Sequence, residues 1–210
     1  MENSKCKTCR RVGQKLFLKG DRCASQKCGI IRRPFLQTKK KKGGRTQFSE
    51  YGRQLLEKQK VKWIYGLRET EFKKSVKKAL SKPQKEGMGF VEFLIDKLER
   101  RLDNVVFKGG LVSSRSKARF FVSHGHFLVN KKKVNIPSYE IKKGDTVSIR
   151  DKSKNTAPFK ELANTLKKYQ TPSWMDIDRE KFEIKIIGNP SKEEFSLPVD
   201  LQKVGEFYSR

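Results

Sequence analysis

The stretch from Arg101 to Arg150 constrains the fold more than any other part of the chain. It opens inside a helical pattern in which apolar residues recur every four positions: Leu94, Leu98, Leu102 and Val106. Gly109-Gly110 breaks this helix. A short second helix follows, with Ser113 or Ser114 as its N-cap and Gly125 as its C-terminal stop.

Short extended segments follow the second helix. They comprise residues 127–129, 134–136 and 146–149, with turns at 130–132 and at Gly144-Asp145. We therefore expect a small antiparallel sheet after the helix-turn-helix unit. Asn130-Lys131 stands where Asn-Gly is common in hairpins, so we expect a longer or more strained turn there.

Positive charge dominates the composition. The chain has 50 Lys and Arg against 23 Asp and Glu, a formal net charge of +27, and 35% of its residues are hydrophobic. Such a chain repels itself unless a polyanion neutralises it, so nucleic acid is the expected partner. An anionic membrane surface is the alternative, but the basic residues run along the whole chain instead of forming one amphipathic helix. No apolar run approaches the roughly 18 residues that span a bilayer, and the N-terminus lacks a signal-peptide pattern, so we expect a cytoplasmic protein.

Four cysteines lie close to the N-terminus: Cys6, Cys9, Cys23 and Cys28. The pattern C-x2-C, thirteen residues, C-x4-C favours a structural zinc site, because each close pair supplies two ligands from a tight turn. An iron–sulfur cluster also accepts four thiolates, and the spacing does not exclude it. Two disulfides or free thiols are the remaining alternatives. The surrounding Lys and Arg are expected to lower the thiol pKa and favour the thiolate that a metal needs.

Two helices are predicted between the cysteines and the central stretch. The first runs from Ser49, its N-cap, to about Tyr65. The second carries apolar residues at four-residue spacing: Phe72, Val76 and Leu80. Residues 82–87 form a linker before a helix that starts near Met88.

One more helix and two strands are predicted after the central stretch. The helix is marked by Phe159, Leu162, Ala163 and Leu166. The two strands lie at 174–178 and 182–186.

Several sequence blocks resemble one known family. Four of them resemble the small RNA-binding module named after ribosomal protein S four: residues 101–106 (RLDNVV), 114–119 (SRSKAR), 122–124 (VSH) and 129–130 (VN). Others are similar to the N-terminal domain and C-terminal end of the bacterial ribosomal protein S four family: residues 48–55 (FSEYGRQL), 57–66, 197–199 (LPV) and 206–210 (EFYSR). The cysteine spacing resembles the metal-binding form of that family. The chain lacks the family's Arg-Tyr-x-Gly-Pro lead-in and its Gly-Gln-His-Gly after Pro34.

The resemblance implies an α+β fold with a helical N-terminal domain, a four-cysteine zinc site and a helix-turn-helix module carrying an antiparallel sheet. It also implies a C-terminal segment that packs back on the N-terminal domain, with Phe207 and Tyr208 as its anchor. The expected division is 1–45 for the metal-binding arm and basic linker, 46–87 for the helical part, 88–195 for the RNA-binding domain with its core at about 99–160, and 196–210 for the returning segment.

The function that the resemblance implies is structural. A ribosome-bound protein is expected that binds the 5′ region of small-subunit rRNA at a multi-helix junction and nucleates assembly of the subunit body. Its expected partners are rRNA, ribosomal protein S five at an interface linked to translational accuracy, and the region of S three and the mRNA entrance. Some members of the family repress translation of their own operon. No small-molecule substrate and no membrane partner are expected.

Candidate RNA contacts lie in three places. On the basic arm they are Lys39, Lys40, Lys41, Lys42 and Arg45. On the first predicted helix they are Tyr51, Arg53, Lys58, Lys60 and Lys62. In the module they are Arg101, Arg115, Lys117, Arg119, His124, Lys131, Lys132 and Lys133. Arg115 and Arg119 lie four residues apart on one helix, so they can clamp phosphates together.

No catalytic motif is present. The sequence contains no nucleophile elbow, phosphate-binding loop or dinucleotide-binding loop. Asp103 is expected to pair with Arg100 or Arg101, and the aromatic side chains of the module are expected in the core: Phe120, Phe121 and Phe127. The alternative is an accessory RNA-binding protein or an RNA-modifying enzyme with the same module, but no segment has the motifs of a separate catalytic domain.

Overall fold

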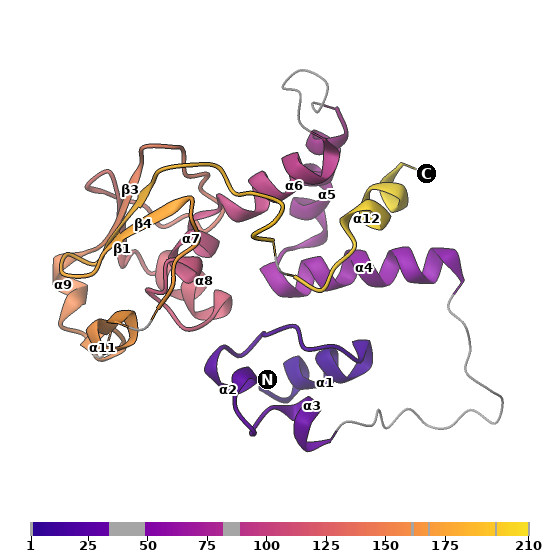
Figure 1. Ribbon diagram of the computed structural model, residues 1–210, viewed down its shortest axis with the longest axis horizontal. Helices are drawn as coiled ribbons and strands as arrows, with labels where there is room; N and C mark the ends of the chain where they lie inside the picture. Colours follow the sequence, from indigo (N-terminus) through magenta and orange to yellow (C-terminus); the bar gives the residue numbers. More distant parts are fainter. Residues whose placement is uncertain are drawn as a thin grey trace. The chain divides into compact units, whose positions relative to one another are not determined.

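The computed structural model describes residues 2–33, 49–81, 89–160, 162–167, 169–195 and 197–209. The chain forms two compact units, one of residues 1–91 with 196–210 and the other of residues 92–195 (Figure 1). The RNA-binding domain was predicted at residues 88–195, and the second unit covers residues 92–195. The C-terminal segment, predicted at residues 196–210, is part of the first unit. The predicted contacts on the basic arm lie outside the described residues: Lys39, Lys40, Lys41, Lys42 and Arg45.

The cysteine-bearing part of the first unit contains one longer helix and two single turns. These are α1 (Glu2–Val12), α2 (Asp21–Ala24) and α3 (Gly29–Arg32). Helix α1 packs against α3. The first pair, Cys6 and Cys9, therefore lies on α1, and the second pair comprises Cys23 on α2 and Cys28, the N-cap of α3.

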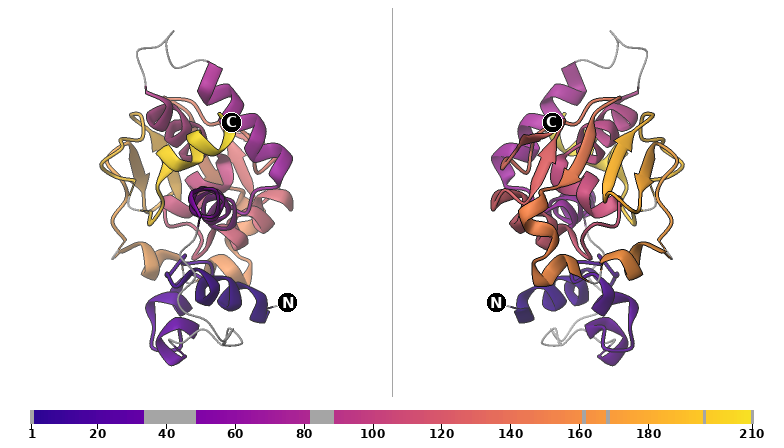
Figure 2. Two further views of the ribbon diagram at one scale, coloured as in Figure 1. Left: turned by 90° about the vertical axis from the view of Figure 1, so that its right-hand side faces the viewer. Right: turned by 90° about the vertical axis from the view of Figure 1, so that its left-hand side faces the viewer.

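Helices α4 (Glu50–Tyr65), α5 (Glu69–Ser81) and α12 (Leu201–Tyr208) form the rest of the first unit. The Oγ of Ser49 accepts a hydrogen bond from the backbone N–H of Gly52 at 3.2 Å, and Gly66 ends α4 in the left-handed conformation with φ 63°. Both predicted ends of this helix are confirmed. Helix α12 packs on α4 and α5 (Figure 2), with Leu201 and Val204 buried. The predicted return of the C-terminus to the N-terminal domain is confirmed.

The helix predicted to run through Leu102 is interrupted. Helix α6 (Phe90–Glu99) ends before Arg101, and α7 (Leu102–Lys108) begins after it. Arg101 is extended, with ψ 137°, and forms an isolated β-bridge with Glu140. The backbone N–H of Leu102 donates to the carbonyl of Tyr139 at 2.9 Å. This long-range pairing outweighs the helical periodicity that the sequence shows.

The strands form one antiparallel sheet in the order β2-β1-β3-β5-β4. They are β1 (Phe127–Val129), β2 (Lys132–Lys133), β3 (Thr146–Ile149), β4 (Met175–Asp178) and β5 (Glu183–Ile186). Strands β4 and β5 were predicted from the sequence, but the sheet that they join was not. They extend the sheet of the module, with β5 next to β3.

The strand predicted at 134–136 is wrong, because the hairpin turn is tighter than expected. Asn130 and Lys131 both have positive φ, 49° and 65°, and they form a two-residue turn that places Val129 opposite Lys132. The turn is therefore not longer, but Lys131 does adopt a strained conformation. Asn130 supports it, since its Oδ1 accepts from the N–H of Thr146 at 3.0 Å.

The core of the second unit lies between the sheet and the helices. Helices α7 and α8 (Arg115–Ser123) supply fully buried side chains, and so do the strands: Val105, Val106, Ala118, Val122, Phe127, Val147 and Ile184. The helix predicted around Leu162 coincides with α10 (Ala157–Lys160) and α11 (Leu162–Lys167), and residue 161 between them lies outside the described residues. A further turn, α9 (Asp151–Lys154), precedes them. Among the residues that the structure describes, no helix is long and apolar enough to cross a membrane.

Candidate nucleic-acid interface

Helix α8 presents one face to the core and the other to solvent. Its N-cap is Ser114, whose Oγ accepts from the N–H of Lys117 at 3.4 Å. Ala118 and Val122 are fully buried, whereas Lys117 and His124 are exposed. Arg115 and Arg119 are half-buried. The helix therefore presents several of the predicted RNA contacts to solvent.

Arg115 is held by groups of the protein itself. Its Nε donates to the Oδ1 of Asn104 at 2.8 Å, and its guanidinium carbon lies 4.5 Å from the centre of the Phe107 ring. The Nδ2 of Asn104 in turn donates to the Oε2 of Glu99 at 2.9 Å. Asn104 and Glu99 are both buried, so this relay fixes the direction of the Arg115 side chain.

The hairpin places three exposed cations on one turn and the short strand after it: Lys131, Lys132 and Lys133. The side chain of Lys133 packs against the backbone of Gly125, the residue that follows the C-cap of α8. Gly125 has φ 71°, and a Cβ at this position would collide with the Cε of Lys133. The structure thus brings the cation of Lys133 next to the end of α8, a proximity that sequence spacing does not reveal.

Arg101 is a buried member of an ion pair. Its Nη2 and Nε donate to the two carboxylate oxygens of Asp103 at 2.9 and 3.1 Å, and the residue is 7% exposed. The predicted pairing of Asp103 is confirmed, with Arg101 as its partner. Burial and neutralisation favour a structural role for Arg101 over the direct RNA contact that was predicted.

The lysines predicted on α4 are also engaged within the first unit. The Nζ atoms of Lys58 and Lys62 lie 3.0 and 2.6 Å from the carboxylate of Glu69. Lys60 pairs with Glu57 at 2.7 Å. Lys58 also lies 4.6 Å from the centre of the Phe207 ring on α12, so this cation helps to bind the C-terminal helix to the N-terminal domain.

Glu69 is the centre of this charge network. Partial burial raises its pKa, but hydrogen bonds from Lys62, Lys58 and Tyr208 outweigh that effect and bring the pKa to about 2. Burial also raises the pKa of Tyr208, and its hydrogen bond to Glu69 acts in the same direction.

Two other predicted contacts on α4 face solvent. Tyr51 is 52% exposed, with its ring centre 5.6 Å from that of Phe207, and Arg53 is exposed. No structural observation tests their contact with RNA, which stays a prediction.

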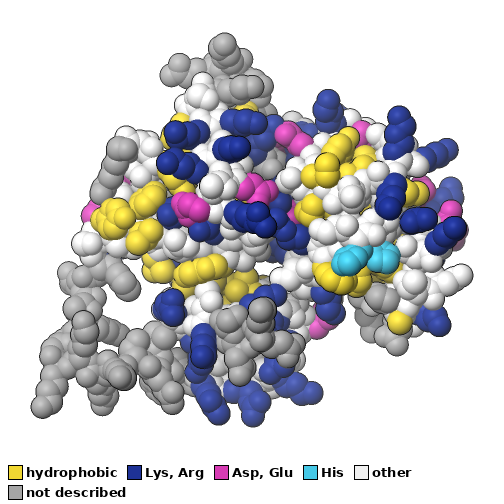
Figure 3. Space-filling view, turned by 180° about the vertical axis from the view of Figure 1, so that it is seen from behind, with side chains coloured by type: hydrophobic (Ala, Val, Ile, Leu, Met, Phe, Trp, Pro, Cys, Tyr) yellow, Lys and Arg dark blue, Asp and Glu magenta, His cyan; other side chains and the backbone are white. Residues whose placement is uncertain are grey.

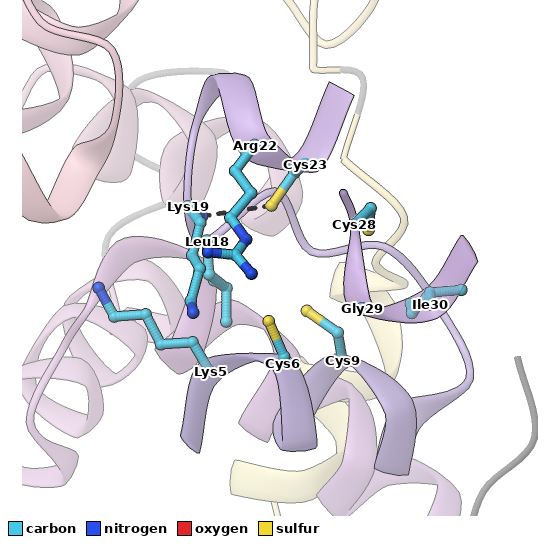
Figure 4. Close-up of a pocket in the computed structure, with 10 residues that line it drawn as sticks. All are labelled: Lys5, Cys6, Cys9, Leu18, Lys19, Arg22, Cys23, Cys28, Gly29 and Ile30. Atoms are coloured by element: carbon cyan, nitrogen blue, oxygen red, sulfur yellow. Dashed lines mark hydrogen bonds between the residues drawn. The ribbon is translucent and has the colours of Figure 1, made fainter. Parts of the chain in front are cut away.

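All four cysteines line one pocket of the first unit (Figure 4). Their thiols are free, so the disulfide alternative is wrong. The sulfur atoms of Cys6, Cys9 and Cys23 point into the same space, and the N–H of Lys19 donates to the Sγ of Cys23 at 3.4 Å. A Cβ on Gly29 would lie 3.0 Å from the Cβ of Cys6, so a larger residue there would press against the Cys6 side chain.

The donor set fits zinc chemistry, but the complete site stays a prediction. Within the described parts of the chain, no group of three or more His, Cys, Asp or Glu side chains is arranged so that it could hold a metal ion. Burial raises the pKa of Cys9, and the neighbouring Cys23, Cys6 and Cys28 charges act in the same direction. The lowered pKa expected from the surrounding cations is therefore wrong for Cys9.

The prediction that the module's aromatic side chains lie in the core holds for Phe127 and is wrong for Phe120. Phe127 is fully buried, Phe121 is half-buried against Phe159, and Phe120 is 57% exposed. Helical phase is the signal that was available in the sequence, because Phe120 lies two residues from both Ala118 and Val122 and so on the opposite face.

The two histidines lie side by side on the face drawn in Figure 3, with hydrophobic side chains beside them and cations around them. The backbone of His124 completes the end of α8, since its N–H donates to the carbonyl of Phe120 at 3.1 Å. His126 is half-buried, and its Nδ1 lies 2.9 Å from the Oγ of Ser153. Burial lowers the pKa of His126, and His124 and Arg150 act in the same direction.

Comparison with known proteins shows that the sequence of this chain is similar to those of ribosomal proteins. Residues 1–95 match the family model described as the ribosomal protein S4/S9 N-terminal domain, and residues 100–147 match the S4 domain. The chain is 45% identical to the small ribosomal subunit protein uS4 of Halothermothrix orenii over 205 residues, which is 98% of this chain and 96% of that protein. It is 44% identical to the protein of the same name from Clostridioides difficile, with the same coverage. For that of Anaeromyxobacter sp. strain K the identity is 44% over 207 residues, 99% of this chain and 97% of the relative.

Proposed function

The chain belongs to the family of the small ribosomal subunit protein uS4, which makes it a structural, rRNA-binding ribosomal protein and not an enzyme, and we propose that it holds together a folded rRNA junction early in subunit assembly. The observation that carries this function is similarity to ribosomal proteins along 98% of the chain. Because that similarity spans both units, the alternative of an RNA-modifying enzyme with an accessory module is not retained.

The physical argument for a junction rests on exposed cations in separate places. Lys117 on α8 and Lys132 on the hairpin are exposed in the second unit, and Arg53 is exposed in the first. A folded junction presents phosphates from several helices at short distances. A protein with basic groups on two units can neutralise them together, and such recognition reads shape and backbone more than base edges.

The finer assignments follow from the family resemblance. The expected site is the 5′ region of small-subunit rRNA, where binding would nucleate the subunit body. Ribosomal protein S five is the expected neighbour at an interface that affects translational accuracy, with S three and the mRNA entrance nearby. Repression of its own messenger is a further family property that can be tested with the same binding assay.

A structural zinc ion belongs to the same proposal. The thiols of Cys6, Cys9, Cys23 and Cys28 would hold it, and it would supply local folding energy, because four protein ligands leave no position for a substrate. The free thiols in one pocket and the N–H donor at Cys23 support it.

Filter binding tests the proposed function. The purified protein is titrated into the 5′ region of small-subunit rRNA, with bulk tRNA as competitor, between about 50 and 200 mM salt. If roughly ten phosphates are neutralised, affinity should fall by several decades over this range, and binding at the lower salt should survive the competitor. Binding that tRNA abolishes would show that only the net charge of +27 acts.

A further inference from the structure

We propose that the exposed rings of Phe120 and His124, with the ammonium group of Lys133, form a binding site for one unpaired nucleobase of the rRNA and its adjoining phosphate. The proposal rests on the rRNA-binding function above. It adds that the protein holds a base at this place, whereas contacts with the junction elsewhere are made to the backbone.

The platform consists of two aromatic rings in contact. Phe120 is 57% exposed, and its ring centre lies 4.2 Å from that of His124, which is also exposed. The two residues lie four apart along α8 and its C-cap, so their side chains share one face. Unstacked bases bind proteins by stacking on Phe and His rings of this kind.

Buried rings hold the platform in place. The Phe120 ring meets Phe121 edge to face at 5.6 Å, and Phe121 lies 5.4 Å from Phe159. Phe159 is 3% exposed and contacts the fully buried Phe127 at 6.0 Å. Because the aromatic contacts continue into the core, packing restricts the Phe120 ring before any ligand arrives, which lowers the entropic cost of binding.

A cation from another element lies at the C-terminal end of α8. Lys133 crosses the backbone at Gly125, and a Cβ on that glycine would lie 3.1 Å from its Nζ. Gly125 directly follows His124, so the ammonium group lies next to the end of the helix that carries the imidazole ring. Lys117, exposed one turn before Phe120, adds a second cation.

These groups favour a nucleotide over an apolar protein surface. A protein docking site needs a large contiguous apolar patch, whereas here the exposed Phe120 ring contacts a histidine, and exposed lysines lie on the same helix and near its C-terminal end. Stacking on the ring and pairing of phosphate with lysine use both parts of a nucleotide. The occupant is therefore a base presented by a loop or bulge of the rRNA.

The test uses the full-length protein and the 5′ region of small-subunit rRNA with tRNA competitor, in a salt series. Phe120→Ala should weaken binding about tenfold at every salt concentration with an unchanged salt slope, because stacking releases no counterions. Phe120→Trp should bind as the wild type does, and Phe120→Leu should behave like Phe120→Ala. Lys133→Ala should instead reduce the slope by about 0.7 to 0.9.

The matched control is Ile187→Ala, since Ile187 is another exposed apolar residue of the second unit, 47% exposed. Circular dichroism checks that each variant is folded. If Phe120→Ala binds RNA as tightly as Ile187→Ala while the wild type keeps its competitor-resistant binding, the base site is wrong and the proposed function stands. If Phe120→Ala binds RNA normally but fails to assemble with other ribosomal proteins, the patch is a protein contact and the base site is again wrong. Loss of competitor-resistant binding by the wild type itself would overturn both.

Discussion

The Nε of Arg115 donates to the Oδ1 of Asn104 across 2.8 Å, and this bond joins a helix that faces solvent to the interior of the second unit. Asn104 is 1% exposed and continues the relay to Glu99. An arginine oriented in this way loses little rotamer freedom when it meets a phosphate.

Asn104→Ala should therefore affect both stability and RNA binding. We expect the free energy of unfolding to fall by about 1–3 kcal/mol, because the buried Glu99 carboxylate loses a donor. RNA affinity should fall as well, because Arg115 loses its orientation. A double-mutant cycle with Arg115→Ala measures the coupling. An effect of Asn104→Ala on affinity that persists unchanged in the Arg115→Ala background would show that Asn104 does not act through Arg115.

Removal of the charge should affect stability at Arg101 and RNA binding at Lys132. Arg101→Ala leaves the buried carboxylate of Asp103 without this partner, and we expect the free energy of unfolding to fall by about 3–5 kcal/mol. Lys132 is exposed, so Lys132→Ala should change stability by less than about 0.5 kcal/mol. It should instead reduce the salt slope of RNA binding by about 0.7 to 0.9. Urea unfolding and filter binding of both variants check this, and an unchanged slope would remove Lys132 from the interface.

Glu69 should make the first unit less stable in acid. Its pKa is about 2 in the folded chain against an ordinary value of 4.5. A depressed carboxylate pKa contributes stability that is complete above the unfolded value and is lost as the pH falls from about 4.5 towards 2. The side chain is 44% exposed, so solvent screening limits the contribution to about 1 kcal/mol.

Comparison of Glu69→Gln with the parent protein measures this contribution. A Trp174→Phe background leaves Trp63 of α4 as the fluorescent reporter of the first unit, because the chain has two tryptophans. The difference in unfolding free energy should be largest above pH 5, should shrink as the pH falls from about 4.5 to 2, and should vanish below pH 2. Glu193→Gln, at an exposed carboxylate of the second unit, is the control. A difference that is independent of pH would contradict the ion-pair explanation.

Gly205→Ala should destabilise the protein although it lies in a helix. Helix propensity alone predicts a gain of about 1 kcal/mol. However, a Cβ at this position would lie 2.8 Å from the Cε1 of Phe90, so we expect overpacking to cost about 1–3 kcal/mol. Urea unfolding should show the loss, and adding Phe90→Ala should reduce the further cost of the alanine. If Gly205→Ala lowers the free energy of unfolding equally in the wild-type and Phe90→Ala backgrounds, the strain does not come from contact with Phe90.

Zinc should stabilise the cysteine-bearing part alone. We expect native mass spectrometry to show one zinc ion per chain, and Cys9→Ser or a chelator to remove it. Protease cleavage should then increase within residues 1–33, while the second unit stays folded. Gln26→Ala, at an exposed position between the two cysteines of the second pair, is the control. A wild-type chain that retains no metal would exclude the zinc site, and global unfolding of Cys9→Ser would contradict the division into units.

Local chemistry in the sequence was sufficient to place many elements. Ser49 and Gly66 mark the ends of α4 because capping depends on neighbouring backbone groups. The strands around Val147 and Ile184 follow from alternation of apolar residues. The sequence also determined the family and the dominance of positive charge, since both are properties of residue identity and order.

The tertiary structure decided which cations face solvent. Lys58, Lys60 and Arg101 were predicted as RNA contacts from composition and resemblance, and they are buried in ion pairs. The partner of Lys58, Glu69, lies eleven residues away on the next helix, so this pairing depends on how α4 and α5 pack, which short-range patterns do not encode. Lys60 and Arg101 have partners close in sequence, and for them packing decided the burial of the pair. The break at Arg101 and the approach of Lys133 to Gly125 have the same origin. Each depends on contacts between segments apart in sequence, and only the folded chain brings those segments together.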